Sequence, residues 1–200
     1  MTIKKKIKIF SKDVFAAYLK RDQSLKQDEV ELVCSFFQHE FLKKEEPLLA
    51  AGNKYKKIVF IIEGILRVFI YDNNGDEVVK NFIEPNSFFA DIESFDNDKN
   101  SLINVSAVTD CKILTLSKAD AEKLITQLPK WEYLMKAGGI RAMNQMIKKR
   151  EFLLIGDSAS QYRHFVKHHP LLAQQVPLKY IASFLRITQS SLSRIRKQRF

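Results

Sequence analysis

The spacing of apolar residues divides the chain into a middle part of short strands and two flanking parts with helical periodicity. Near the N-terminus, the spacing predicts short amphipathic helices over residues 13–20 and 27–38. In the second of these, the residues that fall at the i, i+3, i+4 and i+7 positions of one helical face are Val30, Val33, Cys34 and Phe37. One apolar face on each helix indicates that both pack against the rest of the protein.

From about residue 41 the helical period disappears, and short apolar runs alternate with turn residues. Strands are predicted over residues 47–51, 58–62, 65–71, 78–83, 87–90, 103–108 and 112–116. Asn74-Gly75 between two of these runs predicts a hairpin, because both residues tolerate a positive φ. Strands this short and frequent, without intervening helices, indicate an antiparallel barrel or jelly roll.

Helical periodicity returns after Leu116. Ser117 is a candidate N-cap, and Pro129 is placed to begin a long helix. The apolar residues of this helix recur at steps of three, four and seven, at Trp131, Leu134, Ala137, Ile140, Met143, Ile147 and Leu154. A stripe this narrow is typical of a helix that pairs with a partner helix, so we expect a dimerisation helix over residues 131–155. Packing of this helix on its own barrel is the alternative, and a hinge is expected at residues 156–158.

The last part of the chain predicts two helices joined by a tight turn, over residues 178–185 and 189–197. Thr188 can cap the second helix, because its hydroxyl can accept a hydrogen bond from a free amide of the first turn. Small Ala182 lets the two helices cross closely. The residues expected to meet DNA are Lys179, Thr188, Gln189, Ser190, Ser191, Ser193, Arg194 and Lys197. Their donors and acceptors suit base edges and phosphates.

Charge strengthens this interpretation. Residues 158–200 contain eight Lys or Arg and no Asp or Glu, and so carry +8 of the net charge of +10. An ordinary solvated surface mixes both signs, whereas a basic segment of one sign suits a polyanion whose counterions are released on binding. The segment therefore favours binding to double-stranded DNA over an ordinary basic helical hairpin.

Several other classes of protein are disfavoured. The longest apolar run, residues 58–71, is interrupted by Glu63 and Arg67 and is too short to cross a membrane, and no signal peptide is recognisable, so we expect a cytoplasmic protein. Two cysteines, Cys34 and Cys111, are expected to be buried small apolar residues. A jelly-roll enzyme needs several histidines on its strands, and the histidines lie outside residues 47–116, so neither a catalytic nor a metal site is expected.

A barrel, a long helix and a C-terminal helix-turn-helix, in this order, resemble the Crp/Fnr family of bacterial transcription regulators over nearly the whole chain. Residues 61–69 are similar to the second and third strands of that family's roll, with Gly64 in the turn. The resemblance implies an α+β fold with an N-terminal double-stranded β-helix (jelly roll) of the cyclic-nucleotide-binding type over residues 1–118. A dimerisation helix and hinge would follow over residues 119–157, and a helix-turn-helix DNA-binding domain over residues 158–200. It also implies a homodimer whose two recognition helices enter successive major grooves.

The effector pocket departs from the family pattern. Cyclic-nucleotide-binding members use a Gly-Glu-Leu segment and an Arg-Ser-Ala segment, and the corresponding pocket residues here are Ala90, Asp91, Ile92, Asn100 and Ser101. Asp91 can still accept a ribose hydroxyl, but Asn100 lacks the charge and the bidentate fork of the phosphate-binding arginine. Lys99 and Arg67 are the candidates to replace that charge. A cyclic nucleotide, a different small-molecule effector and the absence of any ligand all stay open.

The DNA-reading helix departs as well. Well-known members present Arg, Glu and Arg where this chain has Gln189, Ser190 and Arg194, so we expect Arg194 to read guanine and Gln189 to read adenine. Arg186 occupies a turn position where glycine is usual. No wing is predicted after the second helix, so the basic residues Arg196, Lys197 and Arg199 are expected to clamp the DNA backbone. The alternative function is a dimeric regulatory or interaction module that no longer reads DNA.

Overall fold

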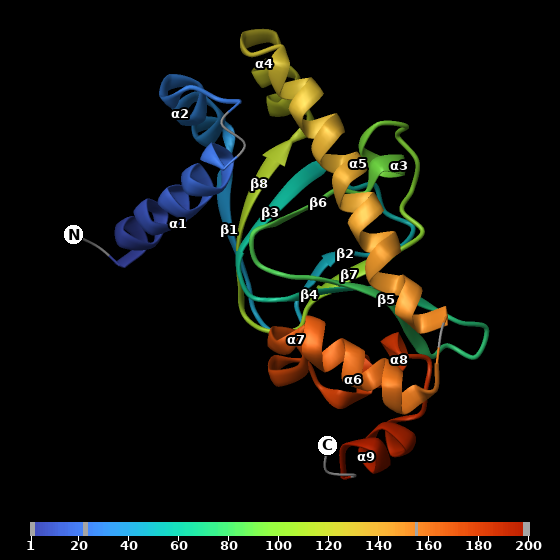
Figure 1. Cartoon of the computed structure of the whole chain (residues 1–200). Coiled ribbons are helices and arrows are strands. Elements are labelled where there is room, and N and C mark those ends of the chain that lie inside the picture. The colour runs from blue at the N-terminus through green and yellow to red at the C-terminus, as the bar shows by residue number, and fades with distance from the viewer. Residues whose placement is uncertain (1–2, 22–23, 155, 198–200) are drawn as a thin grey trace.

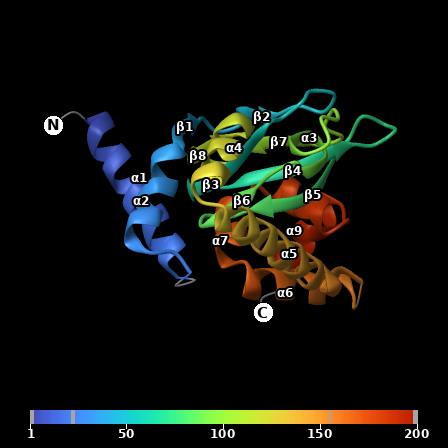
Figure 2. The ribbon, with the colours of Figure 1, turned by 90° about the horizontal axis from the view of Figure 1, so that it is seen from above.

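The computed structural model describes residues 3–21, 24–154 and 156–197 of the chain. Within these residues a roll of antiparallel strands forms the centre, and helices from both ends of the chain pack around it (Figure 1). Seen from above, the first two helices lie on one side of the roll and the C-terminal helices lie on another (Figure 2). Arg199 and residue 155, which the sequence assigns to the basic tail and to the dimerisation helix, lie outside the described residues.

The roll consists of two four-stranded antiparallel sheets, in the orders β1-β8-β3-β6 and β2-β7-β4-β5. The strand bounds are β1 Gln38–Leu42, β2 Pro47–Leu49, β3 Lys57–Glu63, β4 Leu66–Tyr71, β5 Glu77–Ile83, β6 Ser87–Phe89, β7 Asn104–Ala107 and β8 Cys111–Ser117. Every strand predicted from the alternation of apolar runs and turns is present, with its ends shifted by no more than two residues. The mixed helix and antiparallel-sheet fold with a jelly roll is therefore confirmed.

The helices precede, interrupt and follow the roll. Their bounds are α1 Ile3–Lys20, α2 Gln27–Phe36, α3 Ile92–Phe95, α4 Lys118–Gln127, α5 Lys130–Glu151, α6 Ser158–His168, α7 Pro170–Gln175, α8 Leu178–Phe184 and α9 Gln189–Lys197, with a 3-10 turn η1 at Phe152–Leu154. The long helix α5 runs across the roll from α4 toward α6 (Figure 1). Ser117 caps α4 as predicted, because its hydroxyl accepts a hydrogen bond from the Asp120 amide.

Two predicted helices have other bounds in the structure, and some helices were not predicted. The helix predicted over residues 13–20 begins at Ile3, and the helices α3, α6 and α7 were not predicted. The helix predicted over residues 27–38 ends at Phe36, because Phe37 is already extended (φ −82°, ψ 134°). Phe37 is still buried, so its apolar spacing continued past the end of the helix. The chain then enters β1 at Gln38, which places His39 on a roll strand.

Alternation along β3 divides the core of the roll in two. Phe60 packs outward against the N-terminal helices, whereas Val59 and Ile61 point into the space between the sheets. Gly64, which connects β3 to β4, has φ +93°, and a Cβ there would lie 2.4 Å from the Asp110 carbonyl oxygen, so only glycine fits. At the predicted hairpin between β4 and β5, Gly75 alone has a positive φ, at 83°.

Both cysteines are buried and unlinked, as expected. Burial raises the pKa of the Cys34 thiol and of the Cys111 thiol to about 11 in each case. At neutral pH both side chains are therefore protonated, small and apolar.

Candidate DNA interface and effector pocket

The helices α8 and α9 form the predicted pair with a tight turn between them. The turn is made by Arg186 in the left-handed conformation, with φ 57°. The Ile187 amide donates to the Ala182 carbonyl at 3.0 Å, which draws the start of α9 close to the small residue in α8. The arginine at the usual glycine position therefore adopts the positive φ that the turn requires.

The buried side of α9 holds it in place. Leu192 and Ile195 are buried in one cluster with Tyr162 and Phe165 of α6 and with Ile181 of α8. The opposite side of α9 faces solvent, and its exposed residues include Gln189, Ser190, Arg194, Arg196 and Lys197. The residues predicted to read bases therefore lie on the accessible face.

The hydroxyl groups at the start of α9 form hydrogen bonds within the helix terminus. Thr188 Oγ1 accepts a hydrogen bond from the Ser191 amide at 3.1 Å, which confirms Thr188 as the N-cap. The same oxygen lies 2.9 Å from Ser190 Oγ and 2.8 Å from Ser191 Oγ. Ser191 and Ser193 are half-buried. The serines and the threonine thus form a polar rim, whereas Gln189 and Arg194 extend from the exposed face.

Positive charge surrounds this face. The exposed basic residues of the C-terminal helices and their turn are Arg163, Lys167, Lys179, Arg186, Arg194, Arg196 and Lys197. Because residues 158–200 contain no carboxylate side chain, these charges are not offset within their own segment. Such a surface attracts a polyanion.

The predicted effector residues lie at α3 and at the loop that leads to β7. Asp91 Oδ2 is buried without a hydrogen-bond partner, so this oxygen can accept a ligand hydroxyl. Ile92 and Asn100 are exposed. Ser101 is buried, but its hydroxyl already bonds to the backbone of Ile103 at 3.0 and 3.1 Å.

The lysines near this loop form ion pairs with carboxylates. Lys99 pairs with Glu93 at 2.8 Å, and Asp98 pairs with both Lys54 and Lys56, which holds the pKa of its carboxyl at about 2. Arg67, the other candidate for replacing the lost arginine, lies on β4 and binds Glu77 and Glu45. Asp91 therefore offers an acceptor for a ligand hydroxyl, and the nearby cations Lys54, Lys56 and Lys99 are paired with carboxylates.

The helix α5 divides into two parts. Trp131 is buried in the core beside the roll, so this first residue of the predicted stripe packs on its own chain. Farther along, large apolar side chains are exposed, at Tyr133, Ile140, Met143, Met146, Ile147 and, in η1, Leu154. Exposed apolar patches of this kind are typical of interaction surfaces.

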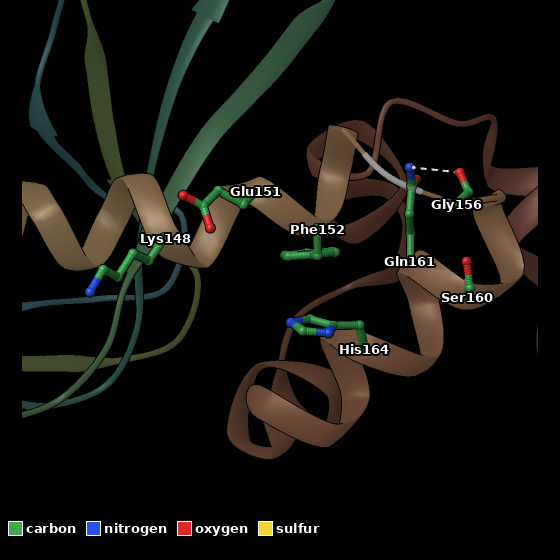
Figure 3. Close-up of a pocket in the computed structure, with 7 residues that line it drawn as sticks. All are labelled: Lys148, Glu151, Phe152, Gly156, Ser160, Gln161 and His164. Carbon is green, nitrogen blue, oxygen red and sulfur yellow. Dashed lines mark hydrogen bonds between the residues drawn. The ribbon is translucent and has the colours of Figure 1, made fainter.

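An open cleft of about 400 Å³ lies where α5 passes into α6 (Figure 3). The rings of Phe152 and His164 stack at 4.5 Å, and Gln161 donates to the backbone carbonyls of Leu153 and Gly156. Burial, followed by the neighbouring His168, lowers the pKa of His164. These contacts hold the predicted hinge, where Gly156 has φ 81°.

The two histidines before Pro170 lie in different environments. His168 is exposed at the end of α6, but His169 is buried, with Nδ1 3.1 Å from Glu84 Oε1 of the roll. Among the described residues, no group of three or more His, Cys, Asp or Glu side chains is placed to hold a metal ion. In the same part of the chain, no helix is both long enough and apolar enough to cross a membrane.

Residues 39–128, from β1 to the end of α4, match the family of cyclic nucleotide-binding domains. The chain is also 28% identical to the cyclic AMP receptor protein of Thermus thermophilus over 105 residues, which are 52% of this chain and 48% of that protein. The match thus spans about half the length of this curated relative. The family match covers the roll and α4.

Solved structures extend the likeness beyond the roll. The c-di-GMP-responsive global regulator CLP of Xanthomonas campestris superposes with a TM-score of 0.68 and 13% identity, over 86% of this chain and 91% of that one. FixK2 of Bradyrhizobium japonicum gives a TM-score of 0.69 and 13% identity, over 81% and 83%. The Thermus thermophilus catabolite activator protein gives 0.53 and 20%, over 87% and 83%. At these identities the likeness shows the fold.

The fold and the matched roll define a class: a cyclic nucleotide-binding jelly roll followed by a long helix and C-terminal helices. The family that combines these parts is the Crp/Fnr family of regulators, and the resemblance predicted from the sequence is confirmed.

Proposed function

We propose that this protein is a sequence-specific DNA-binding transcription regulator that acts as a cytoplasmic homodimer. The observation that carries the proposal is the exposed face of α9, which presents Gln189, Arg194 and Lys197 in a segment without acidic side chains. A helix of this kind, supported from behind by buried Leu192 and Ile195, has the shape and the charge to enter a major groove. The resemblance to the Crp/Fnr family supports a regulatory role over an enzymatic one.

The proposed contacts follow from side-chain chemistry. Arg194 is assigned to a guanine, whose O6 and N7 accept the two parallel donors of a guanidinium, and Gln189 is assigned to an adenine. Lys179 and Lys197 are assigned to phosphates, which position the protein on the duplex but carry no sequence information. Thr188, Ser190, Ser191 and Ser193 are assigned to the rim of the contact.

The homodimer is proposed to form through the exposed apolar residues of α5, because pairing two copies of this stripe removes it from water. A single nine-residue helix reaches few base pairs. Two such helices on half-sites about one helical turn apart multiply both affinity and discrimination, so a pseudo-palindromic operator is expected. A small-molecule effector of the roll would offer a hydroxyl to Asp91, since Asn100 gives a phosphate no counter-charge.

The test starts from an operator selected from random duplex DNA with the full-length protein. Arg194→Ala should lower the discrimination against a single altered base pair by about 1–3 kcal/mol, because a bidentate contact is lost. Lys197→Ala should weaken operator and unrelated DNA about equally and reduce the salt slope by about one. Binding is measured by titration at several fixed salt concentrations.

Lys123→Ala is the matched control, because Lys123 lies on α4 and is exposed beside Asp120. It removes one positive charge from the whole chain and should change neither discrimination nor salt slope. If the control variant, Arg194→Ala and Lys197→Ala all bound DNA like the wild-type protein, α9 would not be the interface. The dimeric module that does not read DNA would then be the better description.

A further inference from the structure

The helix α8 docks directly on the roll, against β5. Phe184 of α8 packs on Phe82 of β5, with ring centroids 5.4 Å apart, and both side chains are buried. One apolar cluster contains Ile65, Val79 and Phe82 of the roll together with the buried residues of α6, α8 and α9. The C-terminal helices and the roll therefore share a core.

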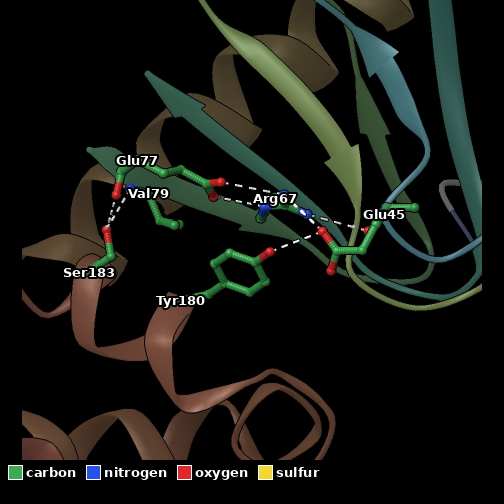
Figure 4. A network of polar contacts seen from close by, with 7 residues as sticks. Glu45, Arg67, Glu77, Val79, Tyr180 and Ser183 are labelled. Carbon is green, nitrogen blue, oxygen red and sulfur yellow. Dashed lines mark hydrogen bonds and ion pairs between the residues drawn. The ribbon is translucent and has the colours of Figure 1, made fainter. Parts of the chain in front are cut away.

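A serine completes this contact with the backbone of the roll. β5 is the end strand of its sheet, so the backbone groups on its outer edge have no strand partner. Ser183 Oγ donates to the Glu77 carbonyl at 2.9 Å and accepts from the Val79 amide at 2.9 Å. One hydroxyl on α8 thus satisfies two edge groups of β5 (Figure 4).

A buried arginine stands beside this edge. Arg67 of β4 is 5% exposed, and its Nε lies 2.7 Å from Glu77 Oε1. Its Nη2 lies 3.0 Å from Glu45 Oε2, and the same Glu45 oxygen accepts the Tyr180 hydroxyl of α8 at 3.0 Å (Figure 4). The guanidinium carbon lies 4.2 Å from the centre of the Tyr180 ring. Tyr180 therefore contacts both members of the Arg67–Glu45 pair.

The protonation of this network is stable at neutral pH. Burial lowers the pKa of Arg67, but its hydrogen bond to Glu77 and the charges of Glu77 and Glu45 outweigh burial and raise it above its ordinary value. Burial and the hydrogen bond to Glu45 raise the pKa of Tyr180. The arginine stays charged and the tyrosine stays a donor. The contact of Tyr180 with Arg67 and Glu45 therefore depends on the position of α8 and not on a change of protonation near neutral pH.

We call the contact of α8 with β5, made by Arg67, Tyr180 and Ser183, the dock. The dock lies behind the proposed DNA interface. Lys179, assigned to a phosphate, has its Nζ 4.6 Å from the centre of the same Tyr180 ring. α9 is fixed to α8 by buried Leu192 and by the Ile187–Ala182 backbone bond. The direction in which α9 points, relative to the roll, therefore follows from how α8 sits on β5.

Resting on the proposed function, we propose that Arg67, Tyr180 and Ser183 are positioning residues for operator recognition. They fix α8 to the edge of β5 so that the two recognition helices of a dimer have the separation and orientation that paired half-sites demand. None of the three touches DNA. A loss of the dock lets α9 adopt several orientations, which weakens binding to a two-half-site operator but leaves contact with any single stretch of phosphates intact.

The experiment uses Tyr180→Phe, which removes one hydroxyl and keeps the ring over Arg67, and the double variant with Ser183→Ala. Without DNA, the exchange rate of the Val79 amide reports docking, and Tyr180→Phe should raise it about fivefold or more. With DNA, the double variant should lose about tenfold in operator affinity while its affinity for unrelated DNA and its salt slope stay within about twofold of wild type.

Tyr71→Phe, on exposed Tyr71 at the end of β4, and Ser35→Ala on α2 remove the same groups elsewhere and should change neither readout. Simple destabilisation would lower both DNA affinities together, so it is distinguishable from a positioning role. An unchanged exchange rate of the Val79 amide in Tyr180→Phe would show that the Tyr180 hydroxyl does not hold α8 on β5, which overturns the proposal. Faster exchange with unchanged operator affinity overturns the positioning role.

Failure of the proposed function would look different. If the wild-type protein showed no sequence preference, both proposals would fail together, and amide exchange would still report whether the dock exists. If the wild-type protein preferred an operator and the double variant kept that preference in full, only the positioning role would fail.

Discussion

The roll is covered by helices on two of its faces, and the two contacts are built from different chemistry. On the face formed by β3, β6 and β8, helices α1, α2 and α4 bury an apolar core centred on Phe15, Phe37, Phe60 and Phe88. Phe15 alone has ring centroids at 4.6 Å from Phe37 and 4.7 Å from Phe60. On the face formed by β4 and β5, helix α8 adds hydrogen bonds and ion pairs to a smaller apolar contact.

The difference between the apolar and the polar contact shows which helices are held firmly on the roll and which can change their orientation. An apolar core holds its helices whatever their exact angle, since burial has no direction and separating them exposes a large apolar area. Hydrogen bonds and ion pairs depend on distance and direction and can be exchanged for bonds to water at a small net cost. We expect the N-terminal helices to stay packed on the roll. The orientation of α8 relative to the roll is the one that can change.

The largest expected effect is on the apolar face. Phe60→Ala removes a ring that is fully buried and contacts Phe15, Tyr18 and Phe88. The free energy of unfolding should fall by about 3–5 kcal/mol, because the loss of buried area is compounded by a cavity. Denaturant unfolding of the variant and the wild-type protein measures the change.

The same variant tests the separation of the two faces. The fraction that remains folded at low temperature should keep its preference for an operator, since Phe60 belongs to the cluster of the N-terminal helices and not to that of α6, α8 and α9. Val68→Ala, inside the roll, offers a comparison for a buried truncation outside the aromatic cluster. A loss of preference in folded Phe60→Ala protein would show that the two faces are coupled.

A smaller effect is expected on the polar face. Arg67→Met keeps the volume of the side chain but leaves Glu45 and Glu77 without their cation. Removing one member of a fully buried pair costs about 3–5 kcal/mol, but Glu45 is half exposed, so about 1–3 kcal/mol is expected here. Denaturant unfolding again measures the change.

Charge neutralisation separates this loss from a packing defect. Adding Glu77→Gln to Arg67→Met removes an uncompensated carboxylate, so the double variant should recover part of the lost stability. If the double variant were as unstable as the sum of the two single changes, the packing of the arginine stem, and not its charge, would hold this face together.

The two faces also differ in how well the sequence predicts them. Short apolar runs separated by turn residues and the hairpin at Gly75 are local patterns, and they predicted the roll. The turn at Arg186 and the cap at Thr188 depend on neighbouring residues, and both are where the sequence places them. The helix face through Val30 and Phe37 predicted burial correctly but misplaced the end of the helix.

Sequence patterns could not predict the contact between α8 and β5. Tyr180 and Glu45 are 135 residues apart, and Ser183 and Val79 are 104 apart, so no periodicity brings them together. Arg67 is the one residue that carried a signal, because a charge in the middle of an apolar strand needs a buried partner. In the sequence Arg67 was only one of two candidates, with Lys99, for the counter-charge of a ligand phosphate, and the structure pairs it with Glu45 and Glu77. His169 and Glu84 are missed for the same reason, being 85 residues apart.

An ion pair lies at the margin of the apolar face, and the smallest effect is expected there. Glu29 of α2 binds Lys130 at the start of α5 with 2.6 Å between Oε2 and Nζ, and it also accepts the Lys26 amide at 2.7 Å. The hydrogen bond from Lys130, followed by that from Lys26, lowers the pKa of Glu29 from its ordinary 4.5. Because the folded protein holds the carboxylate in its charged form, unfolding takes up a proton in acid.

Glu29→Gln should therefore lower the melting temperature slightly at pH 7, by less than Arg67→Met. The contribution of Glu29 is complete above its unfolded pKa of 4.5 and is lost as pH falls through the lower pKa of the folded state. The difference between variant and wild type should shrink steadily between pH 5 and about pH 3. Glu122→Gln, on an exposed position of α4, is the charge-matched control. A difference that persisted at pH 3 would assign the effect to the shape of the side chain, leaving the apolar face without any electrostatic contribution from this pair.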